Sequence, residues 1–154
     1  MADSGEIGLR GERATMEWGA RLLAPLLAKR RPPQGALMTL DGPLGAGKST
    51  LVRAMLRAAG VGGPVPSPTY ALVEPYVLPG LTVLHLDLYR LSDPDELAML
   101  GLDQWRGPDT VTLVEWSSRL PGVLGTADLS VELAHGKSRD GSARRALWQW
   151  RSEP

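Results

Sequence analysis

A glycine-rich segment that ends in lysine and serine is the part of the sequence best suited to chemistry. Residues 42–49 read Gly-Pro-Leu-Gly-Ala-Gly-Lys-Ser and match the pattern G-x-x-x-x-G-K-[ST] at every fixed position. Glycines let a backbone wrap closely around a phosphate group and direct its N–H groups at the phosphate oxygens. We therefore predict a phosphate-binding loop whose nucleotide contacts come from Gly42, Leu44, Gly45, Ala46, Gly47, Lys48, Ser49 and Thr50.

Three side chains at the end of this loop can contact a bound nucleotide and its metal. Lys48 can reach the β- and γ-phosphates, Ser49 can place its hydroxyl on Mg²⁺, and Thr50 can donate to the α-phosphate. A helix that begins here adds partial positive charge beside the phosphates. Lys48 is one of only three lysines in the chain. The loop alone does not define the reaction, since kinases, GTPases, ATPases and inert nucleotide binders all carry it.

Phosphoryl transfer also needs a carboxylate that holds Mg²⁺ from a second side, usually at the end of a buried strand. Glu115 follows the mostly apolar run 111–114, and Asp87 follows the mostly apolar run 83–86. Each of them also suits an ordinary solvated carboxylate at a strand end. Beside a phosphate loop, we predict that both take part in the site.

Other polar and aromatic residues are weaker candidates. Thr69, within Ser-Pro-Thr-Tyr at 67–70, lies where GTPases carry a switch threonine, although this segment also suits a simple proline turn. His85 and His135 could contact phosphate or water, but a histidine inside a strand is more often structural, and His135 has the weaker claim. Trp116 is expected mainly to pack beside the site.

The elements that must position these residues follow from apolar spacing and turn residues. Pro25 should kink or restart the first helix, and Gly60 should end the second. We expect helices at 11–29, at 48–59 and from Asp93 onward, and strands at 36–41, 70–77, 81–86, 110–115, 129–133 and 145–150. Strands alternate with helices early in the chain and further strands follow, which predicts an α/β domain with a mixed sheet.

Length and composition narrow the class of protein. The 154 residues fit one domain spanning 1–154, and no apolar run approaches the roughly 18 residues of a membrane span. The absence of cysteine excludes disulfides and thiolate metal sites. Net charge is zero, yet residues 61–115 hold two basic and eight acidic residues, a balance of −6. A broad basic surface for nucleic acid is therefore not expected. A cytoplasmic location is the default expectation, although the absence of cysteine fits any compartment.

Two absences separate the classes of nucleotide-binding protein. The guanine-reading motif Asn-Lys-x-Asp is missing, which argues against a GTPase. Small-molecule kinases usually carry a lid rich in arginine, whereas residues 88–109 hold only Arg90 and Arg106. A small-molecule kinase remains an alternative to an ATPase, and so does a nucleotide-sensing interaction module with negligible turnover.

Four motifs in order resemble the TsaE family, ATPases of the bacterial pathway that makes threonylcarbamoyladenosine in tRNA. They are GPLGAGKS at 42–49, SPTYALVEPY at 67–76, HLDLYRL at 85–91 and LVEW at 113–116, and the resemblance covers about residues 10–135. It implies a P-loop NTPase-like, three-layer fold with a mixed, partly antiparallel sheet. It also implies ATP binding with Mg²⁺ and slow hydrolysis that depends on TsaD-like and TsaB-like partner proteins. The tRNA would be reached indirectly, with no role for a membrane.

The resemblance implies roles for residues at matching positions. Lys48 would bind phosphate, and Ser49 and Glu115 would hold Mg²⁺. Thr69 would be the switch-like threonine, and Asp87 would act near the attacking water or among the groups around the metal. The catalytic set implied is therefore Asp87, Glu115, Thr69 and Lys48.

Three positions depart from the family pattern, and one of them, Ser49 in place of threonine, is chemically conservative. Pro43 replaces an aspartate and removes one backbone N–H from the loop, while the later amides remain. Ser117 replaces the proline that usually follows the tryptophan, which we expect to loosen that loop. Contacts to adenine stay open and could come from near Glu12 and from the loop 135–141.

Overall fold

A computed structural model describes residues 3–66 and 72–153, which form a mixed β-sheet with helices packed against its faces. The strands are β1 (Ser4–Arg10), β2 (Ala36–Asp41), β3 (Val73–Leu78), β4 (Leu81–Asp87), β5 (Thr110–Glu115), β6 (Leu129–His135) and β7 (Ala143–Trp150). The helices are α1 (Gly11–Leu27), α2 (Lys48–Ala59) and the short α3 (Pro94–Ala98), with single 3₁₀ turns at Leu102–Gln104 and Ser117–Arg119. None of the helices in these ranges is long and apolar enough to cross a membrane.

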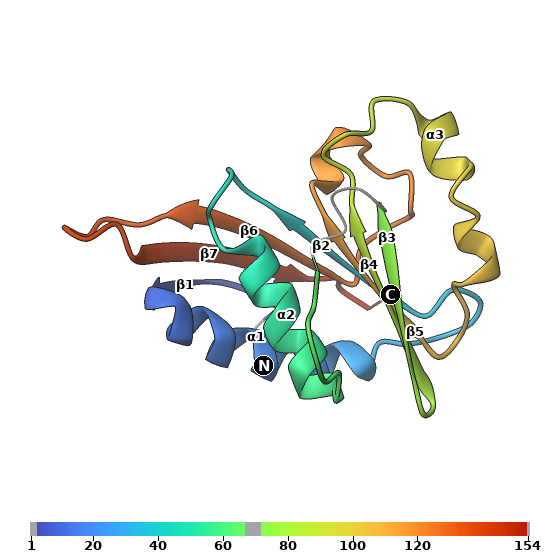
Figure 1. The fold of residues 1–154 in the computed structure, drawn as a ribbon, viewed down its shortest axis with the longest axis horizontal. Helices are drawn as coiled ribbons and strands as arrows, with labels where there is room; N and C mark the ends of the chain where they lie inside the picture. Colours follow the sequence, from blue (N-terminus) through green and yellow to red (C-terminus); the bar gives the residue numbers. More distant parts are fainter. Residues whose placement is uncertain (1–2, 67–71, 154) are drawn as a thin grey trace.

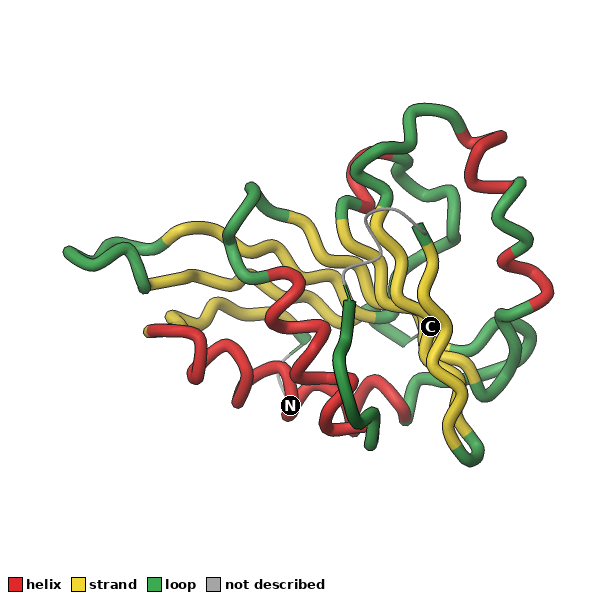
Figure 2. The backbone as a smooth tube through the Cα atoms, viewed as in Figure 1, coloured by secondary structure: helices red, strands yellow, loops and turns green. Residues whose placement is uncertain are grey.

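The seven strands lie in the order β1-β7-β6-β2-β5-β4-β3. Strands β6, β2, β5 and β4 run parallel to one another in the centre, and β7, β1 and β3 pair antiparallel at the two sides. Figure 2 shows the strands as one continuous sheet. The predicted mixed, partly antiparallel sheet is confirmed. Because β2, β5 and β4 are parallel, their carboxyl ends meet at one edge, where α/β proteins commonly bind ligands.

Apolar side chains cover both faces of the central strands and so create three layers. On one face Ala36, Met38 and Leu40 of β2 pack in a core with α1 and α2. On the other face Leu37 belongs to a second core, built with Leu84, Leu86 and Val114 and with residues of α3 and of the connecting loops. Figure 1 shows α1 and α2 together on one side of the sheet and α3 well apart from them. Burial on both faces explains why β2 and β5 read as nearly continuous apolar runs.

Local predictions and structure agree closely around the glycine-rich loop. Strand β2, helix α2 and strand β5 occupy the predicted ranges, and Gly60 ends α2 with a φ of 106°. Helix α1 runs through Pro25 and ends two residues later. Proline removes only one hydrogen bond there, in a turn that is already the last, so the helix needs no restart. The strands predicted at 70–77 and 81–86 appear as β3 and β4, which pair as an antiparallel hairpin, although Tyr70 lies outside the described residues.

Strand β1 was not expected from the sequence. It pairs antiparallel with β7 at the edge of the sheet, and only Ile7 and Leu9 give it an apolar pattern. A side chain at Gly5 would place its Cβ 2.7 Å from the ring of Trp148, so glycine lets the tryptophan lie across the strand. This partner is more than 140 residues away in sequence, and local periodicity carries no information about it.

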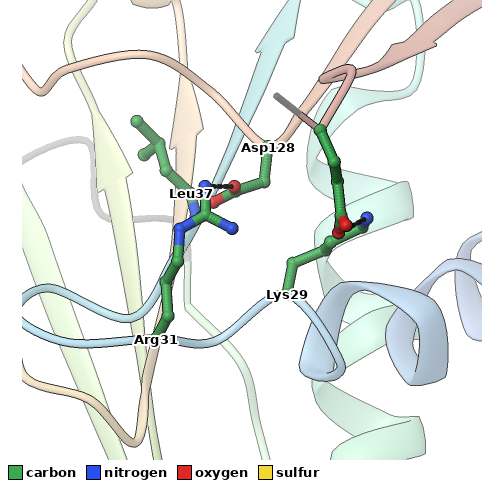
Figure 3. A network of polar contacts seen from close by, with 5 residues as sticks. Lys29, Arg31, Leu37 and Asp128 are labelled. Atoms are coloured by element: carbon green, nitrogen blue, oxygen red, sulfur yellow. Dashed lines mark hydrogen bonds and ion pairs between the residues drawn. The ribbon is translucent and has the colours of Figure 1, made fainter.

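A buried aspartate anchors the start of β2 and thereby the strand that leads into the loop. Asp128 is 4% exposed and accepts hydrogen bonds from the backbone N–H of Leu37 at 2.9 Å and from Arg31 at 3.0 Å, as Figure 3 shows. The backbone N–H of Asp128 in turn donates to the carbonyl of Leu37 at 2.8 Å. The beginnings of β2 and β6 are thus fastened to each other. Lys29 forms a more exposed ion pair with Glu153 nearby.

Candidate functional site

Three carboxylates end three of the four parallel strands, at the edge that carries the loop. Asp41 is the last residue of β2, Glu115 of β5 and Asp87 of β4. Asp87 and Glu115 are paired in register, and Leu40 stands opposite Glu115 on the other side. The sheet therefore brings both predicted carboxylates beside the glycine-rich loop, which begins directly after Asp41.

The backbone of the loop depends on glycine at two places. Gly42 has a φ of 142°, and a Cβ there would lie 2.2 Å from the carbonyl oxygen of Leu133 in β6. Gly47 caps the start of α2 with a φ of 108°, and no side chain caps this helix. The first N–H groups of an α-helix lack partners within the helix and attract anions. A tight loop whose helix begins without a side-chain cap is thus suited to phosphate.

Pro43, the first departure from the family pattern, contributes through its carbonyl group. That oxygen accepts a hydrogen bond from the backbone N–H of Ala46 at 3.1 Å and another from Lys48 Nζ at 3.0 Å. The N–H of Ala46 is therefore used within the loop. Leu44 is 82% exposed on the outside of the loop, and its carbonyl lies 3.3 Å from His135 Nε2 at the end of β6.

Lys48 is folded inward at the mouth of the loop. It is 5% exposed, and Nζ donates to the carbonyl oxygens of Gly42 at 2.6 Å and Pro43 at 3.0 Å. The same nitrogen lies 4.1 Å from the ring centre of Trp116. Burial lowers the pKa of Lys48, while the charges of Glu115 and two aspartates oppose this shift. Two of the three ammonium protons are engaged, which leaves one N–H for an anion.

Glu115 links the loop to the neighbouring strand. It is 2% exposed; Oε1 accepts a hydrogen bond from Ser49 Oγ at 3.0 Å, and Oε2 lies 2.6 Å from His85 Nε2. A hydroxyl beside a buried carboxylate is a donor pair suited to Mg²⁺, which usually takes one or two protein carboxylates together with phosphates and water. Among residues 3–66 and 72–153, no cluster of three or more acidic or histidine side chains forms a metal site. A metal here would therefore depend on a bound phosphate for further oxygen ligands.

Asp87 is 8% exposed, and its Oδ1 accepts a hydrogen bond from the backbone N–H of Tyr89 at 2.9 Å. Burial raises the pKa of Asp87, the Tyr89 hydrogen bond lowers it, and the charge of Glu115 raises it further. The net effect is a carboxylate that takes up a proton more readily than an exposed one. Tyr89 packs on Trp116 with ring centres 4.8 Å apart, and Arg119 lies over the tyrosine ring.

The loop after β5 is tied down, contrary to the expectation that Ser117 loosens it. The Ser117 hydroxyl donates to Asp41 Oδ2, and the backbone N–H of Ser118 donates to Asp41 Oδ1 at 2.9 Å. Trp116 precedes this turn with a φ of 60°, an unusual conformation for a bulky residue. The side chain of Asp41 therefore fastens the loop that carries Trp116 to the entrance of the glycine-rich loop.

A cleft of about 370 Å³ opens beside the loop, on the side of α1. It is lined by Gly11, Glu12, Thr15, Gly45, Gly47, Thr50, Arg53, Ser142 and Arg144. Glu12 was expected near a bound base. Ser142 and Arg144 lie just beyond the expected segment 135–141, and the pairing of β7 with β1 and β6 brings them here.

The structure thus brings together most of the predicted site. Lys48, Ser49, Glu115 and Asp87 lie around the mouth of the loop, and Thr50 lines the cleft. Thr69 lies outside the described residues. Sequence reasoning missed the contact of His85 with Glu115, the contact of Ser117 with Asp41, and the position of Arg144. No local signal could reveal these contacts, because each joins elements that are distant along the chain.

Residues 9–146 match the family described as "Threonylcarbamoyl adenosine biosynthesis protein TsaE". The chain belongs to the TsaE family. It is 44% identical to the tRNA threonylcarbamoyladenosine biosynthesis protein TsaE of Haemophilus influenzae over 110 residues, covering 71% of this chain and 70% of that protein. The protein of the same name from Mycobacterium leprae is 35% identical over 144 residues, covering 88% and 84%.

A solved structure agrees with the fold. The crystal structure of Bacillus subtilis YdiB superposes with a TM-score of 0.68 at 22% sequence identity, covering 99% of this chain and 90% of that one. The three-layer, P-loop type of α/β fold is thereby confirmed. Membership of the TsaE family places the chain among proteins of threonylcarbamoyladenosine biosynthesis.

Proposed function

We propose that this TsaE-family chain binds ATP with Mg²⁺ and hydrolyses it slowly. Hydrolysis would depend on partner proteins and would support the threonylcarbamoyladenosine modification of tRNA. The observation that carries the proposal is the hydrogen bond of 3.0 Å between Ser49 and Glu115. It joins the end of the phosphate loop to a buried carboxylate on a neighbouring strand, which is the arrangement that Mg²⁺-dependent phosphoryl transfer requires.

Nucleotide binding would use the loop and the adjoining cleft. Backbone N–H groups at the start of α2 and the remaining N–H of Lys48 would hold the β- and γ-phosphates. The cleft of about 370 Å³ continues from Gly45 and Gly47 past Thr50. Glu12 and Arg144 line this cleft, and they would lie beside the ribose and the base.

Ser49 and Glu115 would hold the metal, and their oxygen atoms fit a hard cation. When bound, Mg²⁺ would neutralise charge on the phosphates and help to align them. The buried surroundings of Glu115 and Lys48, 2% and 5% exposed, would strengthen these charge interactions, because little water screens them.

Hydrolysis would require a water molecule aimed at the γ-phosphorus. The new bond joins the water oxygen to phosphorus, the bond to the bridging oxygen breaks, and ADP leaves with that electron pair. Asp87 would orient the water and accept its proton, since burial raises the pKa of this carboxylate. Thr69 is proposed as the switch-like threonine on the family motif alone.

The partners would be TsaD-like and TsaB-like proteins, which would act on the tRNA while this chain contacts it only indirectly. The setting would be the cytoplasm, without a role for a membrane. Nucleotide turnover in this chain would then drive a change in the assembled complex. A kinase is the weaker alternative, because residues 88–109 offer only Arg90 and Arg106, and Arg106 already donates to the carbonyl of Leu124 at 3.2 Å.

The test compares ATP binding and hydrolysis of the wild type, Lys48→Ala, Glu115→Gln and the control Ser118→Ala, alone and with both partner proteins. We expect partner-dependent hydrolysis in the wild type and the control. We expect at least a hundredfold loss in the two site variants, in line with loss of an electrostatic catalytic group. Hydrolysis unaffected by both substitutions would refute the proposal, and tight ATP binding without any turnover in the full complex would identify a nucleotide-sensing module instead.

A further inference from the structure

His85 lies on β4, one strand in from the edge strand β3, and is shielded from solvent. It is 1% exposed in β4 and stands between β3 and β5, opposite Glu74 and Leu113. Its Nε2 lies 2.6 Å from Oε2 of Glu115, which is itself 2% exposed. A buried polar pair of this kind contributes little to stability compared with apolar packing of the same volume. Its presence beside the phosphate loop therefore calls for a role beyond packing.

The two oxygen atoms of Glu115 are held by side chains on two different elements. Oε2 contacts His85 on β4, and Oε1 accepts from Ser49 on α2 at 3.0 Å. A single hydrogen bond would leave the carboxylate free to rotate about its terminal torsion, which has a broad energy minimum. Two partners on different elements fix the plane of the carboxylate and direct Oε1 at the phosphate loop.

The surroundings of the imidazole also select the position of its proton. Nδ1 is buried and has no hydrogen-bond partner among residues 3–66 and 72–153. A proton on Nδ1 would be an unsatisfied buried donor, while the bare nitrogen is the less costly state. Nε2 faces a carboxylate oxygen, which only accepts hydrogen bonds. These contacts favour the tautomer in which Nε2 carries a proton and donates it to Glu115.

We propose that His85 is a positioning residue that fixes the Glu115 carboxylate so that Oε1 meets the metal next to Ser49. The inference rests on the proposed function, because it assigns a purpose to an orientation that Mg²⁺-ATP would use. Partners that orient a metal-binding side chain are typically worth about 10- to 100-fold in metal affinity or activity.

The experiment measures the Mg²⁺ concentration that half-saturates ATP binding, together with ATP affinity without Mg²⁺. The variants of the full chain are His85→Leu, which removes the donor, and His85→Gln, whose amide can still donate to Glu115. Thr112→Val is the matched control, because Thr112 is fully buried on β5 and its hydroxyl has no partner among the described residues.

We expect His85→Leu to raise the half-saturating Mg²⁺ concentration about 10- to 100-fold, with ATP affinity in the absence of Mg²⁺ unchanged. His85→Gln should recover most of the loss, and Thr112→Val should behave as the wild type. A His85→Leu variant with wild-type Mg²⁺ dependence would overturn the proposal. So would an equal loss of Mg²⁺-free ATP affinity, because that would mark a general defect of the fold.

A second measurement uses the wild type and therefore does not depend on whether His85→Leu folds. Nitrogen-15 NMR of the wild type reports which ring nitrogen carries the proton, and the chain has only two histidines, so a His135→Gln variant assigns the signals. A protonated Nε2 and a bare Nδ1 are expected, and a protonated Nδ1 would overturn the proposal.

The role of His85 and the proposed function can fail separately. If Glu115→Gln alone shifts the Mg²⁺ dependence, only the role of His85 fails. If the wild type shows no Mg²⁺ dependence, the proposed function fails, and the NMR signals still test the donor.

Discussion

Removing one hydroxyl group should loosen the link between the two loops of the site. Ser117 donates to Oδ2 of Asp41, and Ser118 donates to Oδ1 only through its backbone N–H, at 2.9 Å. Ser117→Ala therefore deletes a hydrogen bond to a carboxylate. Ser118→Ala keeps the backbone N–H that bonds Asp41 and serves as a neighbouring control.

The magnitude follows from the charge and exposure of the acceptor. A hydrogen bond to a charged group contributes about 1.5–3 kcal/mol. Asp41 is partly exposed, so water can replace some of the lost interaction, and we expect the free energy of unfolding to fall by about 1–1.5 kcal/mol. For a chain of this length such a loss lowers the melting temperature by roughly 2–6 °C.

The assay is urea unfolding followed by circular dichroism, with thermal unfolding as a second probe. A cycle with Asp41→Ala isolates the contact, because Ser117→Ala should cost nothing once the carboxylate is gone. ATP affinity should weaken in Ser117→Ala, since Asp41 leads directly into the phosphate loop.

Equal stability of Ser117→Ala and Ser118→Ala, within about 0.3 kcal/mol, would contradict this role of the hydroxyl. So would a loss in Ser117→Ala that is as large without Asp41 as with it. Either result would mean that the hydroxyl does not hold the loop, and that the serine is an inert replacement for proline.

Three further predictions concern Gly42 in the loop, Asp128 at the start of β2, and Asp87 at the end of β4. Gly42→Ala should destabilise the fold by more than about 4 kcal/mol in urea unfolding, since its Cβ would lie 2.2 Å from the Leu133 carbonyl oxygen, whereas Gly62→Ala, with open space around it, should be tolerated. Asp128→Ala should lower the unfolding free energy by about 2–3 kcal/mol, because the buried N–H of Leu37 loses its acceptor. Arg31→Ala should lower it by less than about 1 kcal/mol, because the arginine side chain is 44% exposed. Equal losses in the two variants would contradict this explanation. Asp87→Asn should be more stable than the wild type at neutral pH while losing hydrolysis. Burial raises the pKa of Asp87 in the folded state. The unfolding free energy of the wild type therefore falls as pH rises through the interval between the ordinary and the raised pKa. In urea unfolding across pH, the difference in unfolding free energy between Asp87→Asn and the wild type should grow in that interval and then level off.

The segment from β2 through the phosphate loop to α2 could be predicted almost residue by residue. Its sequence signals are local: an apolar run of six residues, closely spaced glycines, and a glycine at the end of the helix. In the structure these become β2, a loop with glycines at positive φ, and a helix that ends at Gly60. Each of these depends on backbone geometry within a few residues of the position. For the same reason, the roles suggested for Lys48 and Ser49 follow from the motif alone.

Strand β1 and the contacts of His85 could not be predicted in this way. Strand β1 forms because β7 offers an edge, and its own sequence alternates only weakly. His85 looked like an ordinary strand histidine, since nothing nearby in sequence points to a carboxylate. Its partner Glu115 is reached only through the parallel pairing of β4 with β5.

The family, the phosphate loop and the carboxylate at the end of β5 could be predicted from local sequence, because they depend on residue types at short spacing. How that carboxylate is held depends on the assembled fold. The strand order places Glu115 between His85 and Ser49, and the close ends of β2 and β5 let Asp41 hold the turn at Ser117. The physical reason is that strand order is selected by burial of apolar faces summed over the whole chain, and no short segment contains that sum.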